Sequence, residues 1–232
     1  MVNFEFWMAL GTAFVCLAIN FLVNASLKQR IKADRRNEGP VTLQRLAGVV
    51  NFGGLPVLMI ALFLPTTLSE YGLMLSQPRA TALWVLILGA VIVPLGISRA
   101  NSPSNLDMYP QIRNPVWNFR LLAGSAFSWA AYLLAYEFFF RGFLLFACER
   151  AVGAIPSIVI NVVLYAIAHI HKGRFETIGS IPLGIILCIA TLTTGSIWVA
   201  FGVHLIMAWS NEWASLAYHK HISFKSGKNT PD

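Results

Sequence analysis

Long apolar runs separated by short polar connections make up most of the chain. An apolar run of about 20 residues crosses a hydrocarbon core of roughly 30 Å as a helix, so each run is a predicted membrane span. The pattern therefore predicts an all-α, polytopic transmembrane helical bundle of about seven spans. The expected spans are residues 4–27, 46–68, 81–97, 121–148, 154–169, 178–194 and 196–218.

Two of these runs have unusual features. The second contains Gly53, Gly54 and Pro56, which favour a kink or a close helix–helix contact. The fourth run would be about 42 Å long as a single helix, which is more than the membrane requires. We therefore expect it to tilt, to break or to start outside the lipid.

Composition supports a membrane protein. The 232 residues are 56% hydrophobic and only 12% charged, a balance that excludes an ordinary soluble domain. Cys16, Cys148 and Cys188 lie in apolar runs without CxxC or Cys/His spacing, so neither a disulfide framework nor a thiolate zinc site is indicated. We interpret the three cysteines as small hydrophobic core residues.

The basic residues indicate the topology. If successive connections alternate sides, 14 of the 17 Lys and Arg residues fall on one side, including six in the polar stretch 28–45. Arg79 and Arg150 fall on the other side, and Arg141 lies inside a span. The positive-inside rule makes the base-rich side cytoplasmic, with the N-terminus outside and the C-terminus inside. Topology thus explains the net charge of +7 without a nucleic-acid partner.

Ionisable groups suited to acid–base chemistry occur in the later spans, and the first three spans supply none. We therefore expect residues 1–120 to form three supporting spans with their cytoplasmic connections, residues 121–218 a four-span core, and residues 219–232 a polar cytoplasmic tail. The groups are Glu137, Arg141, His169, His204 and Glu212. A buried polar network without chemistry would give the same distribution.

Glu137 and Arg141 are four residues apart, so on a helix they share a face and can pair. The pair is either a self-contained ion pair that lets Arg141 reside in the membrane or part of a functional site. His169 follows Tyr165 by one helical turn, and the Tyr165 hydroxyl could hold its imidazole. Alternatively, His169 is an interfacial histidine near a helix end.

The positions of Glu137 and His169 along their helices conflict with a shared site. Counted from Leu121, Glu137 lies some 24 Å along its helix, whereas His169 is expected near the cytoplasmic end of its own span.

His204 lies near mid-depth of the last span, where an unpaired imidazole is unfavourable. Asn211 lies close to the same helix face, so both residues could be hydrogen-bonding contacts between helices instead of catalytic groups. Together, a carboxylate, two histidines and an amide are suited to activating water and binding an oxyanion. Zinc held by Glu137, His169 and His204 is a minority alternative, because His-Glu-x-x-His is absent; no cofactor is expected.

Three motifs resemble those of the CAAX-processing and bacteriocin-processing family of membrane peptidases, which includes the type II CAAX prenyl endopeptidases. The family's Glu-Glu-x-x-x-Arg resembles residues 136–141 and is followed by Gly142, and its Phe-x-x-x-His resembles residues 165–169. The third region resembles residues 194–198, leading to His204. The resemblance implies an intramembrane endopeptidase in a multi-pass protein, of the plasma membrane if the organism is bacterial. It also implies membrane-associated peptides or lipidated proteins as substrates.

In this family a glutamate and the second-motif histidine activate water, while a third-motif His and Asn bind the oxyanion. Tyr136 stands where the first glutamate is expected, and Ala208 where the Asn or Asp is expected. Asn211 could replace the latter, although it lies about 10 Å further along the helix. One hypothesis is a peptidase in which Glu137 acts as base with His169, and His204 polarises the scissile carbonyl. The alternative is an inactive member that binds a peptide, lipid or protein partner in an immunity or scaffold role.

Overall fold

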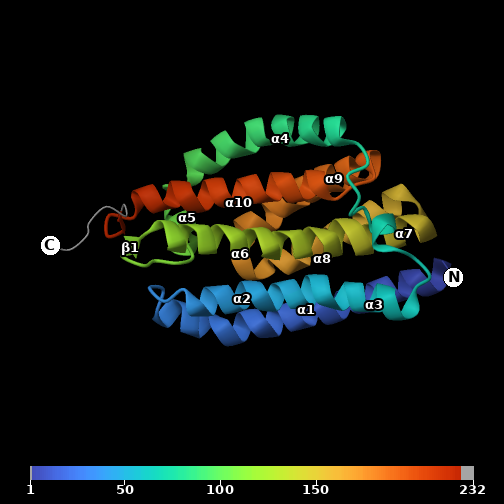
Figure 1. The fold of residues 1–232 in the computed structure, drawn as a ribbon, viewed down its shortest axis with the longest axis horizontal. Coiled ribbons are helices and arrows are strands. Elements are labelled where there is room, and N and C mark those ends of the chain that lie inside the picture. Colours follow the sequence, from blue (N-terminus) through green and yellow to red (C-terminus); the bar gives the residue numbers. More distant parts are fainter. Residues whose placement is uncertain (1, 226–232) are drawn as a thin grey trace.

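The computed structural model describes residues 2–225, which form a bundle of long helices (Figure 1). Lys228 and the last residues of the predicted tail lie outside this range. The α-helices are α1 (Val2–Ala33), α2 (Gly39–Val49), α3 (Leu55–Phe63), α4 (Pro78–Arg99), α5 (Pro103–Met108), α6 (Phe119–Glu137), α7 (Leu145–Val152), α8 (Ala154–His169), α9 (Arg174–Thr194) and α10 (Trp198–Tyr218). The remaining elements are the π-helical segments η1 (Val50–Gly54) and η3 (Phe138–Leu144), the 3-10 turns η2 (Leu68–Tyr71) and η4 (Ile170–Lys172), and the strands β1 (Val116–Trp117) and β2 (Ser223–Phe224).

Six helical segments of the described chain are long and apolar enough to cross a membrane. The chain is an integral, multi-pass membrane protein with an all-α architecture, as predicted. The segments are Asn3–Ala33, Gly39–Phe63, Pro78–Arg99, Phe119–Val152, Ala154–Lys172 and Arg174–Thr194. The predicted seventh span is α10, which is not among the six but runs beside α4 and α6 in the bundle (Figure 1). Seven spans and the orientation of the termini therefore stay predictions.

The continuous segment of α6, η3 and α7 lies at the centre of the bundle (Figure 1). Helices α2 and α10 pack against α6, and α1 and α8 pack against α7. Helix α4 is peripheral and presents exposed Leu83, Leu86 and Val91, an apolar surface of the kind that faces lipid. Glu137, the predicted catalytic glutamate, is the last residue of α6 and therefore lies in this central segment.

The long fourth run stays helical from α6 through α7 and does not break. Its helical geometry changes at η3, a π-helical segment in which all seven residues are buried. A π-helical turn leaves backbone groups without their usual α-helical partners. The carbonyl of Phe140 accepts a hydrogen bond from Asn161 Nδ2 on α8 at 2.5 Å, and Asn161 Oδ1 accepts one from the Cys188 thiol at 3.2 Å. Cys188, like the other two cysteines, is unpaired and buried, which confirms the core interpretation.

The second run also contains a π-helical segment, η1, at the predicted glycine pair. A Cβ atom added to Gly53 would lie 3.1 Å from the Ala135 Cβ atom, and one added to Gly48 would lie 2.3 Å from the ring of Tyr132. The absence of side chains at these glycines therefore lets α2 and η1 approach α6 closely.

The polar stretch 28–45 is largely helical, which differs from the expected loop. Helix α1 continues to Ala33, and α2 already begins at Gly39 with Pro40 in its first turn. Proline is well suited to this position because the N–H it lacks has no helical partner there. Arg45, expected in the cytoplasmic connection, is only 3% exposed and points into the bundle.

A short parallel strand pair joins two distant connections, which the sequence did not predict. Val116 pairs with Ser223, and Trp117 pairs with Phe224. The pair ties the segment before α6 to the segment after α10.

Glu137 and His169 were expected at different depths along their helices. They lie at similar depths when the residues are counted from Gly153, where the two helical segments meet. This glycine, with a φ of +81°, turns the chain from α7 into α8. Glu137 and His169 are each 16 residues from it, on helical segments that pack together. Helix α8 is only about 24 Å long, so it ends at the level of Glu137 inside the bundle.

Replacing Gly48 by alanine should destabilise the bundle by about 1–3 kcal/mol, because the added methyl group overlaps the Tyr132 ring. Thermal unfolding in detergent measures the effect. Gly89→Ala on α4 is the matched control, since nothing lies within 4 Å of its Cβ position. An equal effect of the two substitutions would contradict the close approach of α2 to α6.

Candidate functional site

Glu137 ends α6 and is completely buried. Its Oε1 atom lies 2.6 Å from His204 Nδ1, and its Oε2 atom lies 3.4 Å from Arg141 Nη1. A carboxylate so far from solvent needs compensating charge, and both partners provide hydrogen-bond donors or positive charge. The expected Glu137–Arg141 pair is therefore present, but it is not self-contained, because one carboxylate oxygen binds the histidine.

Arg141 completes this cluster from η3. Its guanidinium carbon lies 3.9 Å from the centroid of the Tyr165 ring, a cation–π contact. Within the described residues, none of its three guanidinium nitrogens has a hydrogen-bond partner. Arg141 thus supplies charge to Glu137 and packs on Tyr165, which fixes the ring of Tyr165 beside the site.

His169, the last residue of α8, is buried rather than interfacial. Its Nδ1 atom lies 2.9 Å from the Tyr165 carbonyl oxygen and 3.4 Å from the Tyr136 hydroxyl. The expected partner was the Tyr165 hydroxyl, and the backbone carbonyl takes that place. Because a carbonyl only accepts, Nδ1 carries the proton and Nε2 is the nitrogen available to a ligand.

Tyr136, which replaces the glutamate expected from the resemblance, stands between the two histidines. Its ring centroid lies 6.0 Å from that of His169 and 5.9 Å from that of His204. Phe52 and Phe140 pack against the same ring. Tyr136 is therefore held as part of an aromatic cluster, and its hydroxyl is directed to the imidazole of His169.

Both histidines line a cavity of about 880 Å³. Tyr165, Ala208 and Asn211 also line it, whereas Glu137 is not among its lining residues in the described chain. Asn211 thus shares the cavity with His204, but no hydrogen bond joins them within residues 2–225. The cavity gives a ligand access to the two imidazoles and leaves the carboxylate behind His204.

Tyr109 lines the same cavity from the connection after α5. Burial is the main cause that raises the pKa of its phenol well above the ordinary value. The hydroxyl therefore stays neutral over the physiological pH range.

A metal centre is not preformed in the described chain. Within residues 2–225, no group of three His, Cys, Asp or Glu side chains is arranged to hold a metal ion. In the zinc alternative, Glu137 and His204 would have to exchange their mutual hydrogen bond for metal coordination.

A comparison with protein families covers the residues of this site. Residues 117–210 match the family model described as Type II CAAX prenyl endopeptidase Rce1-like. Over these residues the chain is similar to that family. The match confirms the predicted resemblance and covers Glu137, Arg141, His169 and His204. The searches of curated proteins and of solved structures found no match.

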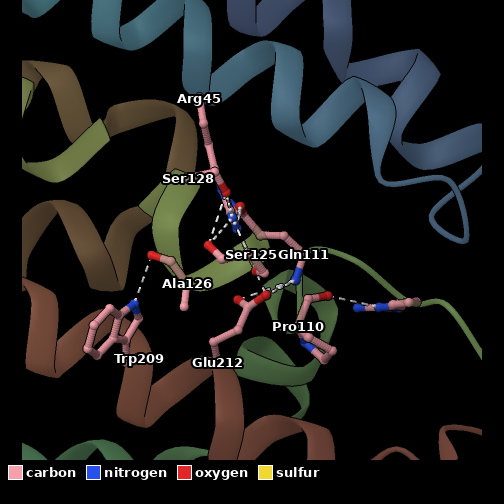
Figure 2. A network of polar contacts seen from close by, with 9 residues as sticks. Arg45, Pro110, Gln111, Ser125, Ala126, Ser128, Trp209 and Glu212 are labelled. Atoms are coloured by element: carbon pink, nitrogen blue, oxygen red, sulfur yellow. Dashed lines mark hydrogen bonds and ion pairs between the residues drawn. The ribbon is translucent and has the colours of Figure 1, made fainter. Parts of the chain in front are cut away.

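Figure 2 shows a second buried ion pair, which contacts residues that line the cavity. Arg45 from α2 and Glu212 from α10 approach to 3.9 Å, and Glu212 is only 1% exposed. Arg45 also donates to Gln111 Oε1 at 2.9 Å and to Ser128 Oγ at 2.8 Å, while its guanidinium lies 4.2 Å from the Trp129 ring centroid. Gln111 and Trp129 line the cavity, so the pair holds part of its wall in place.

The groups predicted for acid–base chemistry all lie in the later spans, and this pair adds a buried base from an earlier one. Arg45 comes from the second span, and Glu5 of the first span binds Arg150 and accepts a hydrogen bond from Tyr71 at 2.7 Å. The sequence signal for Arg45 was weak, because a base at the end of a polar stretch is equally typical of a cytoplasmic loop. Glu212, an acid inside an apolar run, was the available indication that a buried base lies nearby.

Breaking this second pair should cost about 3–5 kcal/mol, because the remaining charge stays buried without its partner. We expect Arg45→Met and Glu212→Gln each to lower the unfolding temperature in detergent. The double variant should lose less than the sum of the two single effects, since it leaves neither charge behind.

Asp107→Asn is the control. Asp107 pairs with Arg35 at 3.9 Å, but its side chain is 76% exposed, so its loss should cost less than about 1 kcal/mol. Additive losses in the double variant would contradict direct coupling of Arg45 with Glu212.

Proposed function

We propose that this protein is an intramembrane endopeptidase that hydrolyses a peptide bond of a membrane-associated peptide or lipidated protein. The observation that carries the proposal is the pair of imidazoles at one cavity, each with its Nδ1 atom already engaged. Their Nε2 atoms are thus available to water and to a carbonyl group. The Rce1-like match over the same residues supports this reaction class.

In the proposed reaction, His169 Nε2 accepts a proton as water attacks the scissile carbonyl carbon. His204, whose Nδ1 atom lies 2.6 Å from Glu137 Oε1, acts in this reaction as an imidazolium, and its Nε2–H donates to the developing oxyanion. When the carbon–nitrogen bond breaks, His169 returns the proton to the leaving amine. In this proposal Glu137 orients His204 and balances its charge during the reaction, which replaces the hypothesis that Glu137 activates water directly.

The second candidate is an inactive member that binds a peptide, lipid or protein partner. Tyr136 favours it, because an aromatic side chain fills the space where the family's first glutamate is expected. Both candidates bind a ligand in the cavity, but only the peptidase cleaves it. Turnover therefore distinguishes them.

Purified protein should cleave members of a library of membrane-anchored peptides, prepared with and without prenylation. His169→Ala and His204→Ala should each reduce turnover by on the order of a hundredfold or more. Glu137→Gln should reduce it similarly, because a neutral amide cannot stabilise the imidazolium. Mass spectrometry of the products measures cleavage and gives the position of the scissile bond.

His221→Ala is the matched control, since this histidine is exposed and does not line the cavity. Full turnover in both His169→Ala and His204→Ala would contradict the catalytic assignment. Peptide binding by the unmodified protein without any cleavage would establish the second candidate.

We also expect dialysis against a metal chelator to leave turnover unchanged, because both proton-transfer groups are imidazoles of the chain. Metal analysis of protein without an affinity tag accompanies the assay. Loss of turnover that zinc restores, together with stoichiometric zinc that His204→Ala abolishes, would establish the zinc alternative.

A further inference from the structure

The cavity that contains the two histidines is lined, within the described range, by six basic residues, most of them near the C-terminal end of α1 and the start of α9. We call its basic lining residues the basic rim. The rim consists of Lys28 and Lys32 of α1, Arg35 of the turn after α1, Arg99 of α4, and Lys172 and Arg174 beside the start of α9. Only two acidic residues, Asp107 and Glu176, are among the lining residues of the described chain.

Those two acids each already have a basic partner in the rim. Arg35 lies 3.9 Å from Asp107, and Lys172 lies 3.8 Å from Glu176. The other four bases of the rim have no carboxylate partner within residues 2–225. The rim therefore has an uncompensated positive charge.

Stability of the fold does not account for this arrangement. Lys28 and Lys32 are four residues apart on one face of α1, and like charges at this spacing destabilise a helix. The positive-inside rule accounts for their side of the membrane, but it is satisfied equally by exposed bases away from the cavity. Low-dielectric walls strengthen the field of such a rim, so it attracts negative charge to the cavity.

The lining also contains groups that suit a peptide as the occupant. Beyond the rim, side-chain amides and hydroxyls of Asn24, Gln44, Ser180 and Asn211 line the cavity, and these groups can bond to a peptide backbone. The same cavity continues to His169 and His204, so one extended chain can contact both the rim and the imidazoles.

We propose that the peptide accepted by this cavity is acidic, with carboxylate side chains that bind the basic rim while the adjoining backbone lies at His169 and His204. This inference rests on the proposed peptidase function and specifies the substrate class of the same site. It follows from the convergence of four unpaired bases on the cavity that contains the histidine pair.

The test uses the full-length protein in nanodiscs of phosphatidylcholine, which has no net charge. Two fluorescent, membrane-anchored peptides are compared by anisotropy; one carries a run of glutamates beside its apolar segment, and the other carries glutamines instead. We expect the acidic peptide to bind at least about tenfold more tightly, with a preference that falls as salt rises.

The rim variant combines four glutamine substitutions and should lose this preference. A matched variant removes the same amount of charge from exposed bases that do not line the cavity, and it should keep the preference. The rim variant is Lys28→Gln, Lys32→Gln, Arg99→Gln and Arg174→Gln; the matched variant is Arg30→Gln, Arg36→Gln, Arg120→Gln and Lys220→Gln.

Equal binding of the two peptides, or a preference that the rim variant retains, would overturn the inference. Competition by phosphatidylglycerol, without any preference between the peptides, would identify a lipid headgroup as the occupant and overturn it too. Cleavage of the same peptides is measured separately. Charge-dependent binding without cleavage refutes the peptidase alone, whereas cleavage without charge dependence refutes the acidic substrate alone.

Discussion

A carboxylate enclosed in an apolar bundle must have fixed partners, and the bundle is arranged around this requirement at Glu137. Helix α10 supplies His204, and η3 supplies Arg141. Helix α9 can approach because Gly184 lacks a side chain; a Cβ atom there would lie 3.3 Å from the Tyr165 ring and 3.6 Å from Arg141 Nη2. The packing of four helical segments is therefore coupled to the charge state of one side chain.

The sequence predicted the bounds of a helix best where the length of an apolar run alone determines them. Helix α8 has the predicted bounds, Ala154–His169, because Gly153 and the polar residues after His169 delimit an apolar run. Arg45 and the strand pair β1–β2 were missed for a common reason. Each depends on residues far apart in the chain, and neither Arg45 nor Val116 has a local pattern that distinguishes it from an ordinary connection.

The candidate site was predictable as a set of residues but not as a set of atomic contacts. Ionisable side chains in apolar runs are costly, so Glu137, His169 and His204 were identifiable by type and position. Which histidine binds the carboxylate depends on helix rotation and on the π-helical segment η3, which no helical periodicity reveals. The structure pairs Glu137 with His204 and leaves His169 to Tyr165 and Tyr136, which changes the chemical role assigned to the carboxylate.

The end of α8 also has a consequence for access from the bilayer. The α-helix itself is about 24 Å long, and the 3-10 turn η4 extends the segment to Lys172, close to the roughly 30 Å of a hydrocarbon core. His171 and Lys172 of this turn line the cavity, so its polar mouth lies at the end of a membrane span. A peptide lying in the headgroup layer would therefore meet the cavity beside His169, without crossing the hydrocarbon core.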